Sequence, residues 1–419
     1  MPPPSSAILS FEDARHQVEQ HASHLHPSGK ELVELLDGAG LVLAEPVVAD
    51  RNFPPFPRAT RDGYAVRAAD TLEVPTRLEV VGEVRAGASP ASITLQAGQA
   101  TAIMTGAAAP PGADAVVMVE YTSEDSGEVT ITRPVAAGEN IGPAGAEAKR
   151  GERLLLPGAR LDYSAISVAA SVGKTHLLVY SKPRIAVLAT GDEIVDIAVP
   201  PGPHQIRNSN TYSLAAQIQA KGGDPLLLPI APDQPQRLRE LIEDGLEADL
   251  LLLSGGVSMG RYDLVEQVLS GLAAEFFFTG AQIQPGRPVV FGRIPCDAEV
   301  PAHQGSSYKY FFGLPGNPVS TMVTFELLVT PLLEALAGLR PRKLIFLQAR
   351  LRSDIRTELG LKRFLPAVLS GEFEAAEVEL LPWQGSGDIA ATARANCYVV
   401  VPPDREHMAA GESVPILMR

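Results

Sequence analysis

Cysteine is scarce in this sequence, which excludes two common kinds of stabilisation. Cys296 and Cys397 are the only cysteines among 419 residues, and they lie far apart, outside any metal-ligand spacing. We therefore expect neither a disulfide framework nor a zinc site, and a reducing compartment is indicated. The chain starts without a basic segment followed by an apolar one, and no apolar run reaches the ~18 residues of a membrane span. We interpret the protein as cytoplasmic.

An excess of basic residues is also absent. Lys and Arg number 35 against 49 Asp and Glu, which gives a formal net charge of −14. Nonspecific binding to nucleic acid and attachment to an anionic membrane both need a broad basic surface, so neither partner is expected. An anionic ligand would have to be held locally, by backbone N–H groups at helix starts and by a few placed cations.

The remaining composition is that of a globular protein with several domains. Hydrophobic residues make up 45% and charged residues 20%, which is ample material for packed cores. A chain of this length is expected to form two to four domains. The 37 Gly and 36 Pro indicate frequent turns between short elements.

Residues 52–146 differ in character from the segments around them. Short β-branched runs separated by Gly and Pro predict strands in a small β-rich domain, at 78–84, 99–103, 115–119 and 128–132. A stiff proline-rich segment leads into this region. A Gly and Ala loop at 138–149 leads out of it, and we expect the chain to return there to the segment that it left.

From about 180 to 335, predicted strands alternate with predicted helices. The strands are expected at 184–189, 225–230, 249–253 and 311–314, and the helices at 211–220, 234–246, 264–272 and 319–336. Such alternation is typical of a doubly wound, mostly parallel α/β sheet. Ligands of such sheets bind outside the carboxyl ends of the strands, so the loops after these strands are the candidate sites.

The two ends of the chain complete the predicted organisation. Apolar residues at helical spacing predict a helix over 11–24, and a second short helix is expected over 29–39. Strands return after Gly338, at 344–351, 364–369, 376–381 and 397–401, and predict a C-terminal β domain.

A glycine-rich loop follows one of the buried strands of the α/β region. Ser254 to Gly260 contains three glycines, which would let the backbone approach a ligand while its N–H groups point outward. The loop matches neither the dinucleotide fingerprint nor a P-loop, so it indicates another kind of anion loop, or else a plain tight turn. Asp263 follows at the helix start and could be a helix cap or a functional carboxylate.

Acidic side chains follow neighbouring strands of the same sheet. Thr190-Gly191-Asp192-Glu193 ends the first strand, and Asp233 and Asp263 follow later ones. Carboxylates gathered at one edge would need a cation or a raised pKa, and oxygen ligands of this type suit Mg²⁺. The alternative is a polar turn with a helix cap.

Further loops carry one cation and several polar groups. Arg287 lies in Gln284-Pro-Gly-Arg-Pro, where its guanidinium could fork onto an oxyanion or could be an ordinary surface side chain. Leu314-Pro-Gly-Asn-Pro-Val-Ser320 places Asn317 and Ser320 at a helix start. In the β-rich region, Asp62 and Thr105 lie beside glycines, which by themselves indicate turns.

Taken in order, these motifs resemble the molybdenum insertase family that includes bacterial MoeA. The motifs that carry the resemblance are Asp62-Gly-Tyr-Ala-Val, Met104-Thr-Gly-Ala, Thr190-Gly-Asp-Glu, Ser254-Gly-Gly-Val-Ser-Met-Gly-Arg-Tyr-Asp263, Pro285-Gly-Arg-Pro and Leu314-Pro-Gly-Asn-Pro-Val-Ser320. Each motif is weak alone, but together and in this order they are specific.

The resemblance implies a homodimer of four-domain subunits. The domains would be an α/β molybdopterin-binding domain at 1–26 and 179–338, a mixed linker and dimerisation domain at 27–51 and 147–178, a β-rich domain at 52–146, and a C-terminal β domain at 339–419. The active cleft would lie between the α/β domain of one subunit and the β-rich domain of the other.

The resemblance also implies the reaction. Adenylated molybdopterin and molybdate would give molybdenum cofactor and AMP with the help of Mg²⁺. The partners implied are these substrates, a second copy of the chain and, transiently, the adenylyltransferase and the cofactor-receiving enzymes. Two alternatives stay open, namely a molybdopterin adenylyltransferase and a non-catalytic protein that binds or presents the pterin.

Site residues are carried over by matching motifs. Those with a catalytic role would be Asp62 and Thr105 from the partner subunit, with Glu193, Asp233, Asp263 and Arg287. Those holding the pterin nucleotide would be Gly191, Ser254, Gly255, Gly256, Ser258, Gly260, Pro315, Asn317, Ser320 and Ser386. The metal ligands would be Asp192, Glu193 and Asp263. Arg363 would also face the cleft. Gln282 and Gln284 stand where the family often has lysines, so Arg287 is the only cation of its motif.

Overall fold

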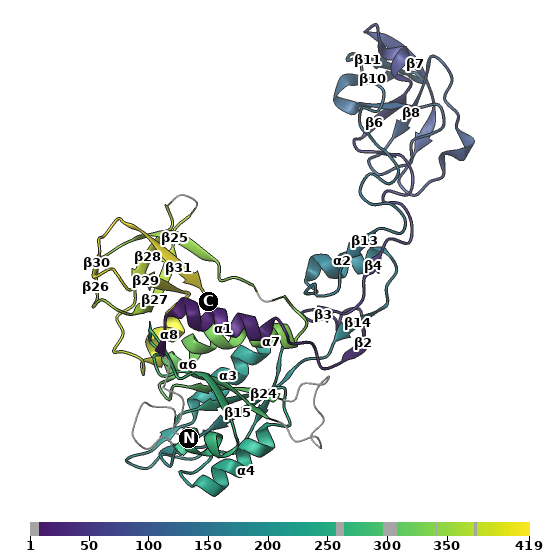
Figure 1. Ribbon diagram of the computed structural model, residues 1–419. Coiled ribbons are helices and arrows are strands. Elements are labelled where there is room, and N and C mark those ends of the chain that lie inside the picture. Colours follow the sequence, from purple (N-terminus) through teal and green to yellow (C-terminus); the bar gives the residue numbers. More distant parts are fainter. Residues whose placement is uncertain (1–7, 257–263, 296–307, 341, 373–374) are drawn as a thin grey trace. The chain divides into compact units, whose positions relative to one another are not determined.

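The computed structural model describes residues 8–256, 264–295, 308–340, 342–372 and 375–419. The chain forms two compact units, each made of separated segments (Figure 1). The first comprises Met1–Ala44, Gly158–Leu161 and Leu177–Arg419, and the second comprises Glu45–Pro157 and Asp162–His176.

A six-stranded sheet forms the centre of the first unit. Its order is β18-β15-β19-β24-β23-β20, and its strands are β18 (Asp224–Leu227), β15 (Arg184–Ala189), β19 (Leu250–Ser254), β24 (Tyr308–Leu314), β23 (Val290–Pro295) and β20 (Glu275–Phe278). The first four are parallel, whereas β23 and β20 join in antiparallel fashion. The predicted doubly wound, mostly parallel sheet is confirmed, with an antiparallel edge.

Helices cover both faces of this sheet. Neighbouring strand residues point to opposite sides, and apolar side chains on both sides need to be buried. Ile185 and Val187 of β15 pack in one core with residues of α1 (Phe11–Ala22), α3 (Ser209–Ala220) and α7 (Thr330–Leu336). Ala186 and Leu188 pack in the other with α4 (Pro235–Gly245) and α5 (Leu264–Gly271). Every residue of β19 is buried, as a strand covered on both faces requires.

The helical segment Pro318–Leu336 lies in the middle of the first core. It consists of α6 (Pro318–Thr324), a π-helical turn η5 (Phe325–Val329) and α7. The segment is long and apolar enough to cross a membrane, with a mean hydropathy of 1.5, but 83% of that window is buried inside the protein. Its apolar character is therefore explained by its place in the core.

The C-terminal part folds as a closed barrel with a sixth strand added. The barrel strands follow the order β27-β28-β25-β31-β29, and a β27–β29 pairing closes the ring. They are β27 (Lys362–Ser370), β28 (Glu377–Leu380), β25 (Phe346–Leu351), β31 (Ser413–Met418) and β29 (Cys397–Val401). The added strand, β22 (Ile283–Gln284), comes from the α/β region, and α8 (Ile389–Arg394) precedes β29. This pairing fixes the barrel beside the loop that carries Arg287.

The helix expected at 29–39 is wrong. Residues Lys30–Glu34 form β2, which pairs with β14 (His176–Tyr180) in a small sheet completed by β3 (Val42–Leu43), and a turn follows. Leu32 and Leu36, which helical spacing would place on one buried face, are 67% and 77% exposed. Pairing with a distant strand overrides a weak local helix preference here.

The second unit contains the predicted β-rich domain. Its six-stranded sheet has the order β10-β11-β7-β8-β6-β9, and only β7 and β8 are parallel neighbours. The strands are β6 (Gly63–Val66), β7 (Thr76–Val84), β8 (Gln99–Ile103), β9 (Ala115–Met118), β10 (Thr122–Asp125) and β11 (Glu128–Ile131). The same unit holds β4 (Val47–Val48), β13 (Arg153–Leu155), the pair β5 (Arg58–Ala59) and β12 (Ile141–Gly142), and α2 (Tyr163–Ser171).

Candidate functional site

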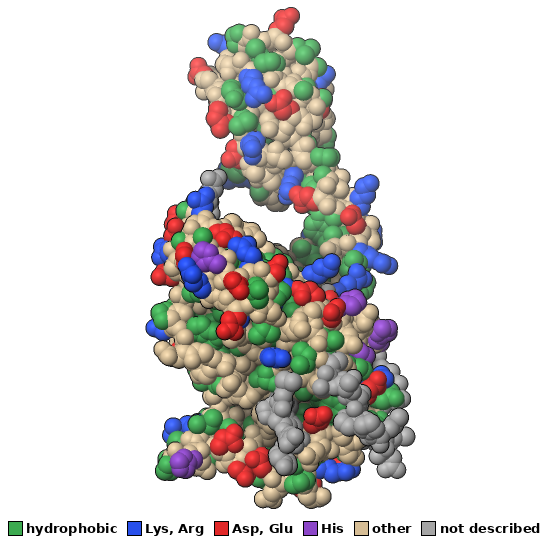
Figure 2. Space-filling view, turned by 60° about the vertical axis from the view of Figure 1, so that its left-hand side comes forward, with side chains coloured by type: hydrophobic (Ala, Val, Ile, Leu, Met, Phe, Trp, Pro, Cys, Tyr) green, Lys and Arg blue, Asp and Glu red, His purple; other side chains and the backbone are tan. Residues whose placement is uncertain are grey.

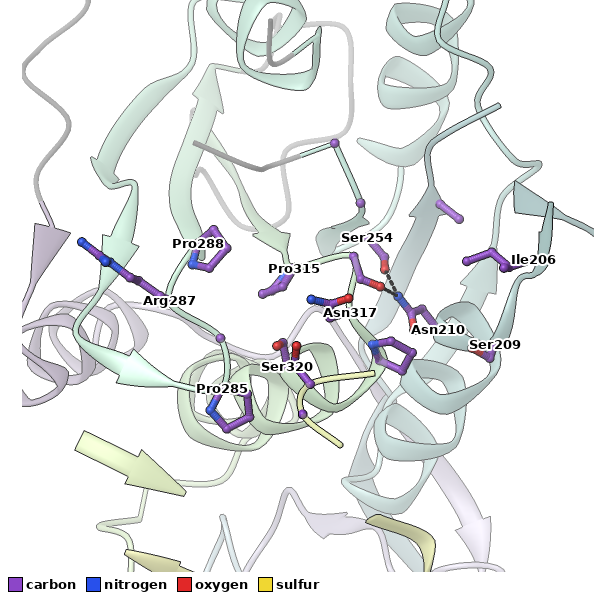
Figure 3. A pocket seen from close by; sticks show the side chains of 18 of the residues that line it. Ile206, Ser209, Asn210, Ser254, Pro285, Arg287, Pro288, Pro315, Asn317 and Ser320 are labelled. Atoms are coloured by element: carbon purple, nitrogen blue, oxygen red, sulfur yellow. Dashed lines mark hydrogen bonds between the residues drawn. The ribbon is translucent and has the colours of Figure 1, made fainter. Parts of the chain in front are cut away.

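A pocket of about 750 Å³ opens in the first unit at the carboxyl ends of β15, β19 and β24. After β15 the chain forms β18 on one side of β15. It then crosses back and forms β19 on the other side of β15. This reversal is the topological switch point at which ligands of doubly wound sheets bind. The pocket lining includes residues from six segments of the chain, namely Thr190, Glu193, Asn210, Ser254, Gly255, Gly256, Gln284, Arg287, Pro315, Asn317, Ser320, Trp383 and Ser386 (Figure 3).

The glycine-rich loop packs tightly against the end of β15. Gly255 has φ +93°, and a Cβ there would lie 2.8 Å from the carbonyl oxygen of Thr190. Gly256 has φ +65°, and its Cβ would lie 2.7 Å from the Thr190 hydroxyl. Both positions therefore require glycine, for conformation as well as for space. Ser258 and Gly260, also predicted for this loop, lie outside the described residues.

The loop after β24 forms the next wall of the pocket. Asn317 precedes α6, and Pro318 occupies its first turn as the sequence predicts. The hydroxyl of Thr321 donates to the carbonyls of Pro315 at 2.5 Å and of Asn317 at 3.1 Å, which holds the loop in shape. The backbone N–H of Val319 donates to the carbonyl of Ser386 at 3.0 Å. That bond brings a C-terminal segment into the pocket wall, and Ser386 lines the pocket.

The third wall is the Gln284-Pro-Gly-Arg287 segment. Gly286 has φ +107°, and a Cβ there would lie 2.4 Å from Cγ2 of Thr324. The side chain of Arg287 is exposed and, in Figure 3, extends away from Ser254 and Asn317. Arg287, the residue predicted to bind an oxyanion, therefore lies at the pocket edge, and its guanidinium points away from the pocket centre.

Arg363, which was expected to face the cleft, supports the wall that contains Gln284. Its side chain is buried, and its Nε donates to Oε1 of Gln284 at 2.7 Å. Its Nη1 donates to the carbonyls of Glu358 and Leu361. A glutamine at 284 is thereby held in a fixed orientation by a barrel residue.

The acidic residues are only partly brought together. Glu193 lines the pocket, and its carboxylate lies against Gly191. Asp192 accepts the backbone N–H of Asp233 at 3.0 Å, so these two acids are neighbours, but neither lines the pocket. Asp263 lies outside the described residues. Within the described ranges, no cluster of three or more His, Cys, Asp or Glu suited to a metal is present.

The two site residues predicted in the β-rich domain do meet. Oδ1 of Asp62 accepts the backbone N–H of Thr105 at 2.6 Å, and both residues belong to the second unit. Hydrogen bonds from the backbone and the hydroxyl of Thr105 lower the pKa of Asp62. The motifs Asp62-Gly63 and Thr105-Gly106 therefore form one local feature.

One wall of the pocket contains none of the motifs singled out in the sequence. Residues Ile206 to Asn210 line it, and they come from β17 (Ile206–Arg207) and the start of α3. Arg207 thereby provides a second cation at the pocket in addition to Arg287. The segment bears no glycine pattern. The available signal was Asn208, which caps α3 by accepting the N–H of Thr211 at 3.2 Å.

Charged side chains of both signs are mixed on one face of the molecule (Figure 2). On the face shown in Figure 2, Lys and Arg side chains are interspersed with Asp and Glu and do not gather into one basic area. The fold and the pocket thus define a protein that binds a small ligand at the switch point of a doubly wound α/β sheet, through loops rich in glycine and proline.

Comparisons with known proteins specify the family. Three family profiles match in succession: the MoeA N-terminal region (domain I and II) at 9–173, a "probable molybdopterin binding domain" at 186–335, and the MoeA C-terminal region (domain IV) at 348–418. A Nostoc protein named molybdopterin molybdenumtransferase is 34% identical over 398 residues, which are 92% of this chain and 88% of the relative. A Haemophilus influenzae protein of the same name is 31% identical and covers 98% of both chains.

A solved structure gives the same answer for the whole chain. The crystal structure of a molybdopterin biosynthesis MoeA protein from Pyrococcus horikoshii is 33% identical, with a TM-score of 0.72, and covers 98% of this chain and 99% of that one. The chain belongs to the molybdopterin molybdenumtransferase family.

Proposed function

We propose that this protein is a molybdenum insertase, which transfers molybdate into adenylated molybdopterin and releases AMP to give molybdenum cofactor. The observation that carries the proposal is the pocket at the switch point, where the Ser254, Gln284 and Leu314 loops converge. The proposal is supported by relatives that match over 92% and 98% of the chain and carry the name molybdopterin molybdenumtransferase.

The pterin nucleotide is assigned to the inner part of the pocket. The backbone of Gly255 and Gly256 can approach an anion closely because neither residue has a side chain. Hydroxyl and amide groups of Ser254, Asn317 and Ser320 line the same space. They provide the few convergent polar groups that orient a bound ligand, as specific pockets require.

Molybdate is assigned to the outer part of the pocket, next to Arg287. A guanidinium offers several donors in a fork that matches tetrahedral oxyanions. Arg287 is exposed and lines the pocket, so its side chain has the freedom to turn toward an incoming anion. Among the described lining residues, Arg287 and Arg207 are the two cations that could bind an oxyanion.

Mg²⁺ is assigned to the acidic side of the pocket. Glu193 lines it, and Asp192 lies beside it with one oxygen already accepting the N–H of Asp233. Carboxylate oxygens at such an edge fit a hard cation that also binds substrate phosphates. Asp263 would complete the set. When bound, the ion would polarise the phosphoanhydride, and Glu193 and Asp233 would keep that side of the pocket negative.

The assembly implied is a homodimer in the cytoplasm. Asp62 and Thr105 would act from the second copy of the chain, where their shared hydrogen bond fixes the carboxylate. Transient contacts with the adenylyltransferase and with cofactor-receiving enzymes would deliver the substrate and remove the product.

Incubation of the purified protein with adenylated molybdopterin, Mg²⁺ and molybdate tests the proposal. The expected result is AMP release that depends on molybdate. An adenylyltransferase would instead form adenylated molybdopterin from ATP and molybdopterin, and a presenting protein would bind without AMP release. Binding with no AMP release at any molybdate concentration would reject the insertase assignment.

A further inference from the structure

Asn210 connects two walls of the pocket. It is the second residue of α3, and its Nδ2 donates to the hydroxyl of Ser254 at 3.0 Å and to the carbonyl of Gly316 at 2.7 Å (Figure 3). Ser254 ends β19, and Gly316 lies in the loop after β24. A single amide therefore ties the glycine-rich loop to the Pro-Gly-Asn-Pro loop.

The number of protons on the Asn210 amide determines whether Ser254 donates or accepts in this contact. A carboxamide nitrogen carries two protons, and both are used by the two bonds of Asn210. Ser254 is thereby the acceptor in its contact with Asn210, so its own O–H proton is left for another acceptor. In the part of the chain that the structure describes, the bond from Asn210 is the only one to the Ser254 hydroxyl. The bond from Asn210 therefore orients the Ser254 hydroxyl so that it can donate its proton to another group.

Two residues of the pocket wall each carry a buried polar atom without a partner among the described residues. Oδ1 of Asn210 and Oγ1 of Thr190 are buried and have no hydrogen bond within the described ranges, and both residues line the pocket. Thr190 is only 5% exposed. Buried polar groups in proteins are nearly always paired, so these two atoms give the pocket wall hydrogen-bonding capacity that the protein itself does not use.

We propose that Asn210 is a positioning residue, which fixes the Ser254 hydroxyl as a hydrogen-bond donor to the phosphate of the bound nucleotide. The identity of that nucleotide rests on the function proposed above. Asn210 would act through Ser254 and not on the reacting atoms. Its effect is that one lone pair of the Ser254 oxygen is occupied before the ligand arrives, so the O–H proton is turned away from Asn210 and is left to donate to the ligand.

The substitution Asn210→Asp tests this role because it keeps the shape of the side chain and removes both donors. The carboxylate would accept the Ser254 proton and would face the carbonyl of Gly316. We expect AMP affinity, measured by titration calorimetry with AMP as the probe, to fall at least about tenfold, the scale of one hydrogen bond to a charged group. Asn396→Asp is the matched control, since Asn396 also donates to a backbone carbonyl, of Leu369 at 2.9 Å, in the barrel.

A double-mutant cycle separates positioning from charge repulsion. Ser254→Ala should weaken AMP binding about tenfold in the wild type and less than about twofold in the Asn210→Asp background, because Ser254 has already lost its donor role there. An equal loss in both backgrounds would overturn the proposal, as would a wild type that does not bind AMP. Thermal unfolding of each variant shows whether the fold is kept. AMP binding needs no molybdate, so a failure of the insertase assignment is read separately, from AMP release by the wild type.

Discussion

The carboxylate of Asp62 accepts the backbone N–H of Thr105 at 2.6 Å and so joins two glycine-flanked motifs that are 43 residues apart in the sequence. A hydrogen bond with the Thr105 hydroxyl adds to the first, and together they lower the pKa of Asp62. Hydrogen bonds to the charged form favour ionisation. The local geometry therefore keeps this carboxylate negative at lower pH than an ordinary aspartate.

Thr105→Val should raise the pKa of Asp62 part of the way toward its usual value. The substitution removes the hydroxyl and keeps the backbone N–H, so the larger of the two effects persists. Carboxyl NMR titration measures the shift. Thr122→Val is the control, because its hydroxyl donates to the carbonyl of Val119 in the same unit. An unchanged Asp62 pKa in Thr105→Val would show that the hydroxyl bond is unimportant.

The same contact predicts the sign of a pH effect on stability. The folded-state pKa of Asp62 lies below its unfolded value of about 3.9, so its contribution to stability is complete above that value. The contribution is lost as the pH falls through the folded-state pKa. Thr105→Val should therefore reduce stability at neutral pH and have little effect in strong acid, as measured by urea unfolding at both pH values.

Gly286→Ala should destabilise the protein more than Gly385→Ala does. Both glycines have φ +107°, a value that strains any residue with a side chain, so each substitution carries a backbone cost. A Cβ at Gly286 would lie 2.4 Å from the methyl of Thr324, whereas a Cβ at Gly385 meets nothing within 4 Å. Thr324 cannot easily rotate away, because its hydroxyl donates to the carbonyls of Ser320 and Thr321. Overpacking adds roughly 1–3 kcal/mol. Equal unfolding midpoints for the two variants would contradict this prediction.

Arg287→Ala should raise the molybdate concentration needed for half-maximal AMP release by about tenfold or more, the scale of one charged hydrogen bond. Binding of adenylated molybdopterin should change little, because the guanidinium extends away from Ser254 and Asn317. Arg207→Ala is the matched variant, since Arg207 lines another wall of the pocket. A molybdate response that is unchanged in Arg287→Ala and altered in Arg207→Ala would move the oxyanion site.

Regular periodicity made the α/β domain predictable. The boundaries of β15 are those expected from its apolar run, and α3, α4 and α5 begin and end within two residues of the expected positions. Buried parallel strands and amphipathic helices each leave a strong local pattern. The prediction for residues 29–39 is wrong because their Leu and Glu fit a helix as well as a strand. Only pairing with β14 decides between the two structures.

The candidate site was predictable where it is built from glycine and proline. Gly255, Gly256 and Gly286 all have positive φ and close neighbours. Only glycine fits such positions, so the residue type itself indicates the tight loop. Asn210 and Trp383 carry no comparable signal. They reach the pocket only through the packing of α3 and of the barrel against the sheet, and such long-range placement leaves no local pattern in the sequence.

The acidic side of the pocket provides the last prediction. Glu193 is the one proposed metal ligand among the described residues that lines the pocket, and its carboxylate folds over Gly191 at a point where a side chain would not fit. Glu193→Gln keeps the size and removes the charge. The Mg²⁺ concentration needed for half-maximal AMP release should rise at least roughly tenfold, since even outer partners of a metal ligand contribute that much to affinity.

Asp196→Asn is the control for Glu193→Gln. Asp196 lies three residues further on, accepts the N–H of Ala198 at 2.9 Å, and does not line the pocket. It carries the same charge near the same edge, so a general loss of negative potential would affect both variants equally. A specific ligand role predicts a changed Mg²⁺ requirement in Glu193→Gln alone. Equal shifts in the two variants would mean that this edge attracts the cation by its overall charge and that Glu193 does not bind it directly.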